Sequence, residues 1–353
     1  MQRFHVLSSL VSSALTTGKS ALRQLALGNG ERKQFASKVK QYKRWVMNDK
    51  VSVKSYYLPY MIPLLLNLSQ SGELVFSIDG SVVGKGCMCL MFSVIYQGKA
   101  IPVVWSVYKA KKGHLPEQAH QDLLKDLSEI VPDNCRIVVV GDGEFDGCDW
   151  QSDILALGWN YVVKTGKGKK ITSTTEDTFK LGLVKTEKGQ EIYYENVKFT
   201  EKKWSTNLLI WHGKEHEKPV YLLTNLDFAP EIKRFYKKRF KIEPFFRDQK
   251  SKGFHIQKSG LQDPQRLQRL LIATCLAYVL AIMAATKACK SIFYSEVART
   301  DGQFLSLFQL GYRFILFLVD IRQWRAFCWY KDFIPDKIQY QEDLTEKLIC
   351  VPF

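Results

Sequence analysis

Two aspartates of this 353-residue chain each follow a short apolar run of the kind that forms a buried strand. Asp79 ends residues 74–79 (LVFSID), and Asp142 follows residues 136–141 (RIVVVG). If the two runs are neighbouring parallel strands, both carboxylates lie at the carboxyl edge of one sheet. Clustered carboxylates are the ligands that hard cations such as Mg²⁺ require, although each Asp-Gly pair is equally compatible with a simple turn.

A third carboxylate lies in residues 235–250, which have helical periodicity. At about 100° per residue, four polar side chains of this stretch share one helix face within roughly 60°: Tyr236, Arg239, Glu243 and Lys250. A carboxylate beside two cations and a phenol suits a metal ligand next to phosphate-binding groups, whereas a solvated helix face is the alternative. Pro244 removes a helix hydrogen bond, so we expect the helix to kink or restart there.

The spacing Tyr-x2-Arg-x3-Glu-x6-Lys of these four residues resembles the YREK signature of the DDE transposases of bacterial insertion sequences, in the IS-four branch. The resemblance covers residues 72–253 and includes the contexts of both aspartates. It departs from many relatives at Gly143, where they carry arginine after the second aspartate. Glu144 and Asp146 are also close by, but Asp142 directly follows the apolar strand and is the better candidate.

The resemblance implies a role for each residue of the signature. Asp79, Asp142 and Glu243 would be the catalytic triad that holds two Mg²⁺ ions, with Mn²⁺ as the alternative ion. Tyr236, Arg239 and Lys250 would contact DNA phosphates.

The resemblance also implies an activity, cut-and-paste transposition. The metal ions, about 3.5–4 Å apart, would activate water or a DNA 3′-hydroxyl and stabilise the leaving oxygen. The partners would be double-stranded DNA, both the terminal inverted repeats and the target, and a second copy of the chain when DNA is bound. Several relatives pass through a hairpin on the transposon end.

A polar stretch, residues 165–219, separates the second and third carboxylates and contains alternating runs of its own. It predicts a β-rich insertion, which by the resemblance would reach the transposon end. Trp204 and Trp211 are its candidates for DNA binding, since stacking on a flipped base returns about 1–3 kcal/mol. The alternative is that both tryptophans pack in the small core of the insertion.

The remaining apolar patterns predict an α/β fold. Three strands are expected within residues 74–108, then a helix at 116–130, the strand 136–141, a helix at 150–157 and a strand at 160–164. With a closing helix after Pro230, this is the order of an RNase H-like domain with a mixed five-stranded sheet and helices. Fold alone does not establish chemistry.

The expected domain organisation has four parts. They are a helical DNA-binding domain at 1–70, the RNase H-like catalytic domain at 71–164 and 220–290, the β-rich insertion at 165–219 and a C-terminal helical region at 291–353. The N-terminal part is rich in lysine at helical spacing, which suits binding of DNA phosphates and equally a solvated helix face.

The charge balance favours a polyanionic partner, because 51 Lys and Arg stand against 35 Asp and Glu, a formal net charge of +16. We expect nucleic acid rather than a membrane, since the basic residues are spread along the chain. Residues 270–286 are uncharged, but their Ala, Thr, Cys and Tyr content favours a buried core helix over a membrane span. The absence of a secretory signal and the scattered cysteines predict a cytosolic protein. The resemblance implies the bacterial cytosol, in association with the nucleoid.

Two other functions are compatible with the same residues. The first is an RNase H-like DNA nuclease without strand transfer. The second is a domesticated, non-catalytic DNA-binding protein. The three carboxylates argue against the second, because a carboxylate cluster repels phosphate and binding alone does not require it.

Overall fold

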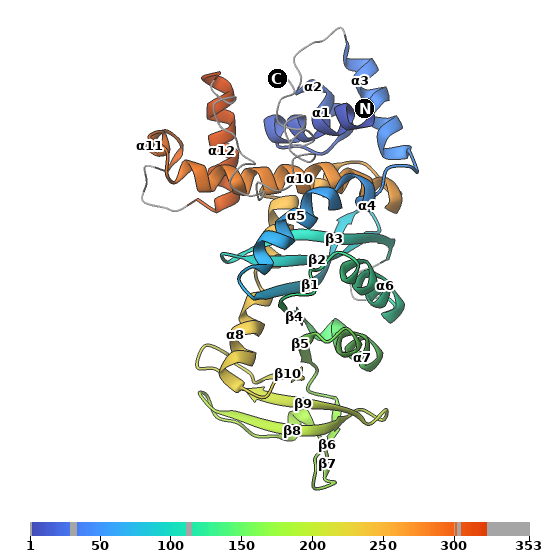
Figure 1. The fold of residues 1–353 in the computed structure, drawn as a ribbon, viewed down its shortest axis with the longest axis vertical. Helices are drawn as coiled ribbons and strands as arrows, with labels where there is room; N and C mark the ends of the chain where they lie inside the picture. The colour runs from blue at the N-terminus through green and yellow to red at the C-terminus, as the bar shows by residue number, and fades with distance from the viewer. Residues whose placement is uncertain (1, 29–33, 111–114, 300, 302–304, 323–353) are drawn as a thin grey trace.

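The computed structural model of the chain describes residues 2–28, 34–110, 115–299, 301 and 305–322. Within these residues, ten strands form one mixed sheet in the order β3-β2-β1-β4-β5-β10-β9-β8-β6-β7, with helices on both faces (Figure 1). The expected α/β class is confirmed.

The first three strands form the expected antiparallel meander: β1 (Glu73–Gly84), β2 (Cys87–Tyr96) and β3 (Lys99–Lys109). Tight turns join them at Gly86 and Gly98, whose φ angles of 68° and 73° suit glycine because it has no Cβ. The prediction that Asp79 ends its strand is wrong. Asp79 pairs with Met91 and β1 continues to Gly84, because the following residues pair along β2, which outweighs the local turn tendency of Asp-Gly.

Two parallel strands follow β1 in the sheet: β4 (Arg136–Gly141) and β5 (Asn160–Thr165). The helices α6 (Glu117–Ser128) and α7 (Cys148–Ala156) precede these strands and cover one face of the sheet (Figure 1). The other face is covered by α8 (Ala229–Arg239).

Alternation along the strands explains how both faces are filled. In β1, Phe76 packs in the core on the side of α6 and α7, whereas Val75 faces α8, where it joins Val138, Ile232 and Phe235. All five are buried. Burial of each such side chain stabilises the fold by about 1.5–3 kcal/mol, so α8 is fixed firmly above β1 and β4.

The insertion extends the sheet rather than forming a separate one. Its strands are β6 (Lys170–Thr172), β7 (Thr178–Lys180), β8 (Glu191–Phe199) and β9 (Trp204–Trp211), and β10 (Val220–Thr224) follows. The expected sheet of five strands is therefore corrected to ten, because β10 pairs with β5 on one side and with β9 on the other.

Among the described residues, five α-helices precede the sheet: α1 (Gln2–Thr17), α2 (Leu22–Leu27), α3 (Phe35–Met47), α4 (Val53–Tyr56) and α5 (Leu58–Ser69). The helices α10 (Pro264–Ala288), α11 (Tyr294–Val297) and α12 (Leu307–Asp320) follow the sheet and α8 in the chain. Of the predicted C-terminal region, residues 323–353 lie outside the described residues.

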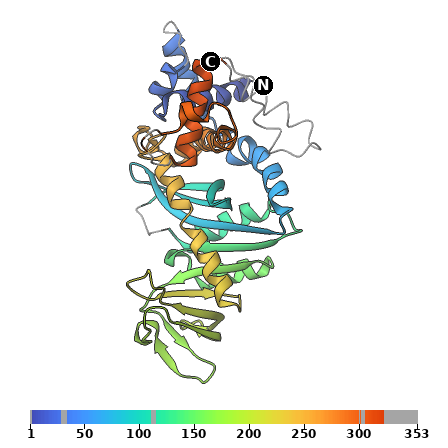
Figure 2. The same ribbon diagram turned by 90° about the vertical axis from the view of Figure 1, so that its left-hand side faces the viewer.

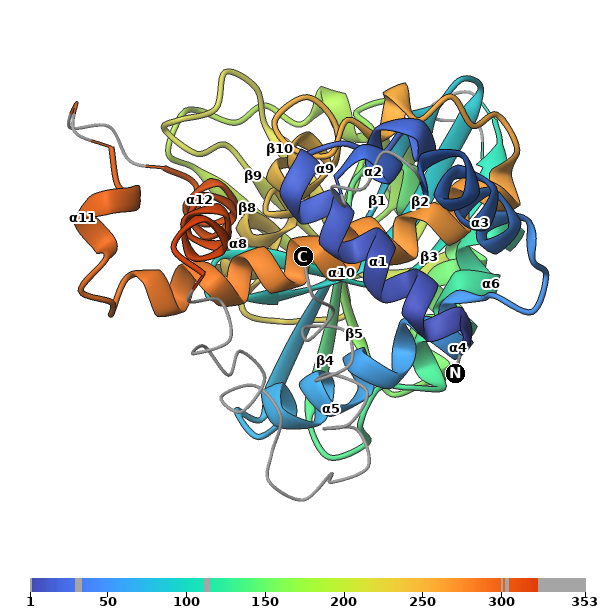
Figure 3. The same cartoon turned by 90° about the horizontal axis from the view of Figure 1, so that it is seen from above.

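The long helix α10 crosses between the N-terminal helices and the sheet (Figures 1 and 3). Among the described helices it alone is long and apolar enough to cross a membrane, and most of it is buried inside the protein, as in a core helix. Arg269 of α10 donates hydrogen bonds to the carbonyls of Val46 and Val51, at 3.0 Å each, and to the Asp49 carboxylate. The end of α3 is therefore tied to the core helix.

Candidate active site

The two aspartates lie where β4 separates from β1. The parallel register pairs Ser77 with Val140, so Asp79 and Asp142 each follow two residues beyond the last pair. Asp142 caps the 3-10 helix η2 (Gly143–Phe145) by accepting a hydrogen bond from the Glu144 N–H at 3.0 Å. Asp79 accepts one from the Gly80 N–H at 2.8 Å. Neighbouring strands thus bring the first two carboxylates to one edge.

The electrostatics of Asp79 show how close the other charges are. Burial raises the pKa of Asp79 to about 6, and repulsion from the Asp142 carboxylate adds to the rise. The Arg239 guanidinium and the Gly80 N–H act in the opposite direction, and Glu243 contributes a further increase. The carboxylates of residues 79, 142 and 243 therefore share one electrostatic environment with a single buried guanidinium.

The four residues of the signature lie on two helices rather than on one face of a single helix. Tyr236 and Arg239 belong to α8, whereas Glu243 lies in the first turn of α9 (Ile242–Gln249) and Lys250 follows its last residue. The break falls before Pro244, which takes a first-turn position where its missing N–H costs no helix bond. The predicted continuous helix is corrected: the helix does restart, but at residues 240–241 rather than at Pro244.

Arg239 connects α8, α9 and β1. Its guanidinium donates a hydrogen bond to Glu243 Oε1 at 3.0 Å and lies 4.2 Å from the ring centre of Phe240. Its backbone carbonyl accepts a hydrogen bond from the Ser77 hydroxyl at 3.2 Å. The Arg239 side chain is buried and its Nε has no hydrogen-bond partner, so the position holds a desolvated positive charge beside the carboxylates.

Lys250 and Tyr236 flank the carboxylates. The Lys250 ammonium donates a hydrogen bond to the Ser81 hydroxyl at 2.5 Å, and Ser81 lies two residues after Asp79 on the same face of β1. Burial raises the pKa of Tyr236, and the charges of Asp142 and Glu243 raise it further, against the effect of Arg239. The phenol therefore stays protonated and able to donate.

Ser77 and Ser81 are site residues that the sequence reasoning missed. Each fixes one cation of the signature, through the Arg239 carbonyl and the Lys250 ammonium respectively. The signal that could have found them is period two, because residues 77, 79 and 81 share one face of a strand.

The nearest alternative ligands differ in their partners: Asp146 is hydrogen-bonded, whereas Glu144 Oε1 is buried without a hydrogen-bond partner among the described residues. Glu144 Oε1 lies 3.8 Å from Nε2 of the buried His120. Asp146 accepts a hydrogen bond from the Thr165 hydroxyl at 2.6 Å and pairs with Lys169 at 3.2 Å. Both interactions direct these carboxylates to the side of α6 and β5.

Within the described part of the chain, no group of three His, Cys, Asp or Glu side chains lies close enough to hold a metal ion. Glu243 is paired with Arg239, and its side chain is 55% exposed, which leaves it room to turn. The donor chemistry fits a divalent cation, because the Asp79 and Asp142 carboxylates repel each other and a bound cation would relieve that repulsion.

The two tryptophans of the insertion both contact other parts of the protein. Trp204 donates a hydrogen bond from Nε1 to the Gln151 side chain of α7 at 3.2 Å and is partly exposed. Trp211 is buried, with the Lys237 ammonium 5.2 Å from its ring centre and the His216 ring edge-on at 4.7 Å.

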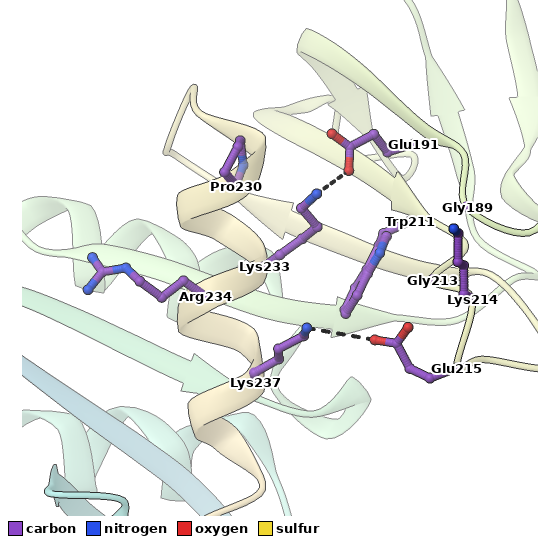
Figure 4. Close-up of a pocket in the computed structure, with 10 residues that line it drawn as sticks. All are labelled: Gly189, Glu191, Trp211, Gly213, Lys214, Glu215, Pro230, Lys233, Arg234 and Lys237. Carbon is purple, nitrogen blue, oxygen red and sulfur yellow. Dashed lines mark hydrogen bonds and ion pairs between the residues drawn. The ribbon is translucent and has the colours of Figure 1, made fainter.

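A cleft between α8 and the insertion contains Trp211 (Figure 4). Lys233 and Lys237 of α8 reach across it to Glu191 and Glu215 of the insertion. This geometry favours the packing interpretation for Trp211, whose ring faces α8, and leaves the Trp204 ring as the more accessible of the two.

Comparison with known proteins places this geometry in a family. Residues 71–280 match the transposase DDE domain. The structure is similar to that of the piggyBac transposase in its synaptic complex with hairpin DNA, at 12% sequence identity and a TM-score of 0.46, over 99% of this chain and 77% of that one. No curated protein sequence matches the chain. Because the matched domain spans more than half of the chain, the chain belongs to the transposase DDE domain family.

Proposed function

We propose that this transposase binds the terminal inverted repeats of an insertion sequence and catalyses metal-dependent strand cleavage and strand transfer. The observation that carries the proposal is the electrostatic coupling of three carboxylates and one guanidinium: Asp142 and Glu243 raise the pKa of Asp79, Arg239 lowers it, and Glu243 pairs with Arg239. Such a cluster in a chain of net charge +16 has no use in plain DNA binding, because it repels phosphate.

We also assign the catalytic core to the RNase H-like class. Support comes from the strand directions, since β1, β2 and β3 form an antiparallel meander and β1, β4 and β5 run parallel. In a parallel arrangement of this kind, sites form at the carboxyl ends of the strands. Asp142 directly follows β4, and Asp79 lies within β1, two residues beyond the last pair with β4.

Asp79, Asp142 and Glu243 would hold two divalent ions, Mg²⁺ with Mn²⁺ as the alternative. When bound, such ions supply an activated water or 3′-hydroxyl and stabilise the leaving oxygen in an in-line displacement.

The protein's own cations bind and orient the DNA. Arg239 lies buried beside the carboxylates, where its planar guanidinium suits two-point contact with a phosphate. Lys250 follows α9, and its hydrogen bond to Ser81 holds its ammonium group against β1. There it supplies a compact point charge near Asp79. The protonated Tyr236 can donate a further hydrogen bond to a phosphate oxygen. Binding the scissile phosphate between these groups would release Glu243 from Arg239.

Further parts of the proposal rest on the spacing of the signature. We place the chain in the IS-four branch with the YREK signature, acting as a homodimer on two transposon ends, in the bacterial cytosol near the nucleoid. These assignments follow from the positions of Tyr236, Arg239, Glu243 and Lys250 in the sequence.

Strand transfer separates this function from that of a nuclease. The full chain would be incubated with Mg²⁺, 50-bp duplexes from both ends of the element that encodes it, and a supercoiled target plasmid. We expect joined products in which the 3′ ends of the duplexes are covalently linked to plasmid strands. Cleavage without joining would indicate the nuclease, and binding without cleavage the non-catalytic DNA-binding protein.

A further inference from the structure

The N-terminal helices carry an unusually one-sided charge. Between Met1 and Asn48, Glu31 is the single acidic residue, against nine Lys and Arg. Neither α1 nor α3 contains an acidic residue. A surface built on these two helices has little internal neutralisation, which suits a polyanion as its partner.

The helix α3 has two distinct faces. Val39, Tyr42, Trp45 and Val46 are buried against the rest of the protein. On the opposite side, three exposed polar residues lie within about 60° at helical spacing: Ser37, Gln41 and Arg44. The polar face forms one wall of a shallow groove between α1 and α3, to which Arg3 of α1 also contributes.

The chemistry of this face differs from that of an ordinary lysine-rich helix. Arginine reads the N7 and O6 acceptors of guanine and glutamine reads adenine, through paired hydrogen bonds in the major groove. Within the described part of the chain, no hydrogen bond or ion pair engages the side chain of Gln41 or of Arg44. Lys40 and Lys43 lie beside this face and are exposed, in position for the phosphates that border the groove.

The helix is held rigidly, as base reading requires. The Tyr42 hydroxyl lies 2.6 Å from the Ser9 hydroxyl of α1, and Trp45 donates a hydrogen bond to the Arg3 carbonyl at 3.1 Å. Arg269 of α10 holds the carbonyl of Val46. Figures 1 and 3 show α3 at the periphery of the molecule, away from the insertion, so a duplex can approach its outer face.

We propose that α3 is the recognition helix of this transposase, which enters the DNA major groove and reads base edges with Gln41 and Arg44, while Lys40 and Lys43 contact phosphates. The inference rests on the proposed function and adds the residues that select the transposon end. The 13 residues of α3 span about 20 Å. The major groove of DNA is about 12 Å wide and admits a helix.

The test selects binding sites from a library. The full chain would be used to enrich a 60-bp duplex library with a random 20-bp centre, first as wild type and then as Gln41→Ala and Arg44→Ala. We expect the wild type to enrich one motif. Each variant should lose base preference at one or two positions and bind that motif roughly 10-fold to 100-fold more weakly, with unchanged affinity for random duplex.

Two sets of controls separate base reading from charge. Lys40→Ala and Lys43→Ala should weaken binding to the motif and to random duplex alike and reduce the logarithmic salt slope by about 0.9 each. Arg313→Ala removes the same charge as Arg44→Ala from an exposed position on α12 and should change neither measurement.

Enrichment of the unchanged motif by both Gln41→Ala and Arg44→Ala would overturn the inference. So would binding through these residues to vesicles containing phosphatidylserine but not to duplex DNA. The strand-transfer reaction distinguishes these failures from failure of the proposed function, because joining by the wild type would stand even if α3 does not read bases.

Discussion

At the scale of single residues, Arg239 determines the state of the site without DNA. Its guanidinium holds Glu243, and its charge lowers the pKa of Asp79, which burial and Asp142 raise. A buried cation that neutralises carboxylates can exchange them for phosphate when DNA and metal arrive. In the mechanism that we propose, the pairing of Arg239 with Glu243 is a resting arrangement of two groups that the reaction would use separately.

Arg239 and Lys250 should therefore each bind one phosphate of the engaged DNA. We expect Arg239→Ala and Lys250→Ala to weaken binding to end duplex and to reduce the logarithmic salt slope by about 0.9 per phosphate lost. Tyr236→Phe should be milder, since it removes one neutral hydrogen bond. Binding at several salt concentrations measures the slope, with Lys125→Ala on α6 as the control. An unchanged salt slope in both variants would show that Arg239 and Lys250 do not contact DNA phosphates.

Asp248 gives the fold a defined pH dependence away from the catalytic carboxylates. Burial raises its pKa from 3.8 to about 6, against the weaker effects of Arg247 and Lys99. The folded state therefore favours the neutral acid, and stability is lost as the pH rises from about 4 through 6.

Asp248→Asn removes this loss. Its free energy of unfolding should exceed that of the wild type by on the order of 2–3 kcal/mol above pH 6, with the difference vanishing below pH 4. Urea denaturation from pH 4 to pH 8 measures it, and the exposed Asp149→Asn is the control. A difference that does not change with pH would show that folding does not raise the pKa of Asp248.

At the scale of elements, the sequence predicted the strand meander, the parallel strands and the restart after α8, because each depends on a local pattern. It missed the continuation of β1 beyond Asp79, since Asp79-Gly80 resembles a turn until its pairing with β2 is known. The break at residues 240–241 was also misplaced, because Pro244 is as well suited to the first turn of a new helix as to a kink.

The order of strands in the sheet was also beyond prediction from local sequence patterns. Alternating runs predicted strands in the insertion, and β8 and β9 are two such strands. The runs could not show that β10 joins these strands to β5, because strand pairing depends on contacts between distant segments. The strand β7 is short because after Lys180 the chain turns into the 3-10 helix η3 (Leu181–Leu183).

The insertion tryptophans should respond differently to substitution. Trp211 is buried beside α8, so Trp211→Ala should lower the melting temperature and destabilise by about 3–5 kcal/mol. Trp204 is partly exposed, and Trp204→Ala should preserve first-strand nicking and lose hairpin product if its ring stacks on a flipped base. Denaturing gels of end-duplex reactions separate nicks from hairpins. Joint loss of nicking, binding and thermal stability in Trp204→Ala would show that it too is structural.

At the scale of the whole molecule, the elements lie in a line. The N-terminal helices with α10 and α12 occupy one end, the insertion occupies the other, and the sheet that carries Asp79 and Asp142 lies between them (Figures 1 and 2). The helices α8 and α9 run along the sheet towards α10 (Figure 2). DNA recognition by α3 and catalysis at the sheet are therefore functions of separate elements, joined through the core helix α10.

Because the two functions belong to separate elements, a substitution should be able to abolish catalysis and leave DNA binding intact. This test bears most directly on the central claim, that Asp79, Asp142 and Glu243 are the catalytic residues. Asp79→Ala, Asp142→Ala and Glu243→Ala would each be compared with wild type and with Asp149→Ala for binding and for Mg²⁺-dependent cleavage of the same end duplex. We predict that each triad variant loses cleavage by about a thousandfold or more while its dissociation constant changes less than about threefold, because metal ligands supply several kcal/mol to the transition state and none to DNA binding. Near-normal cleavage by any one variant would contradict the assignment of that residue.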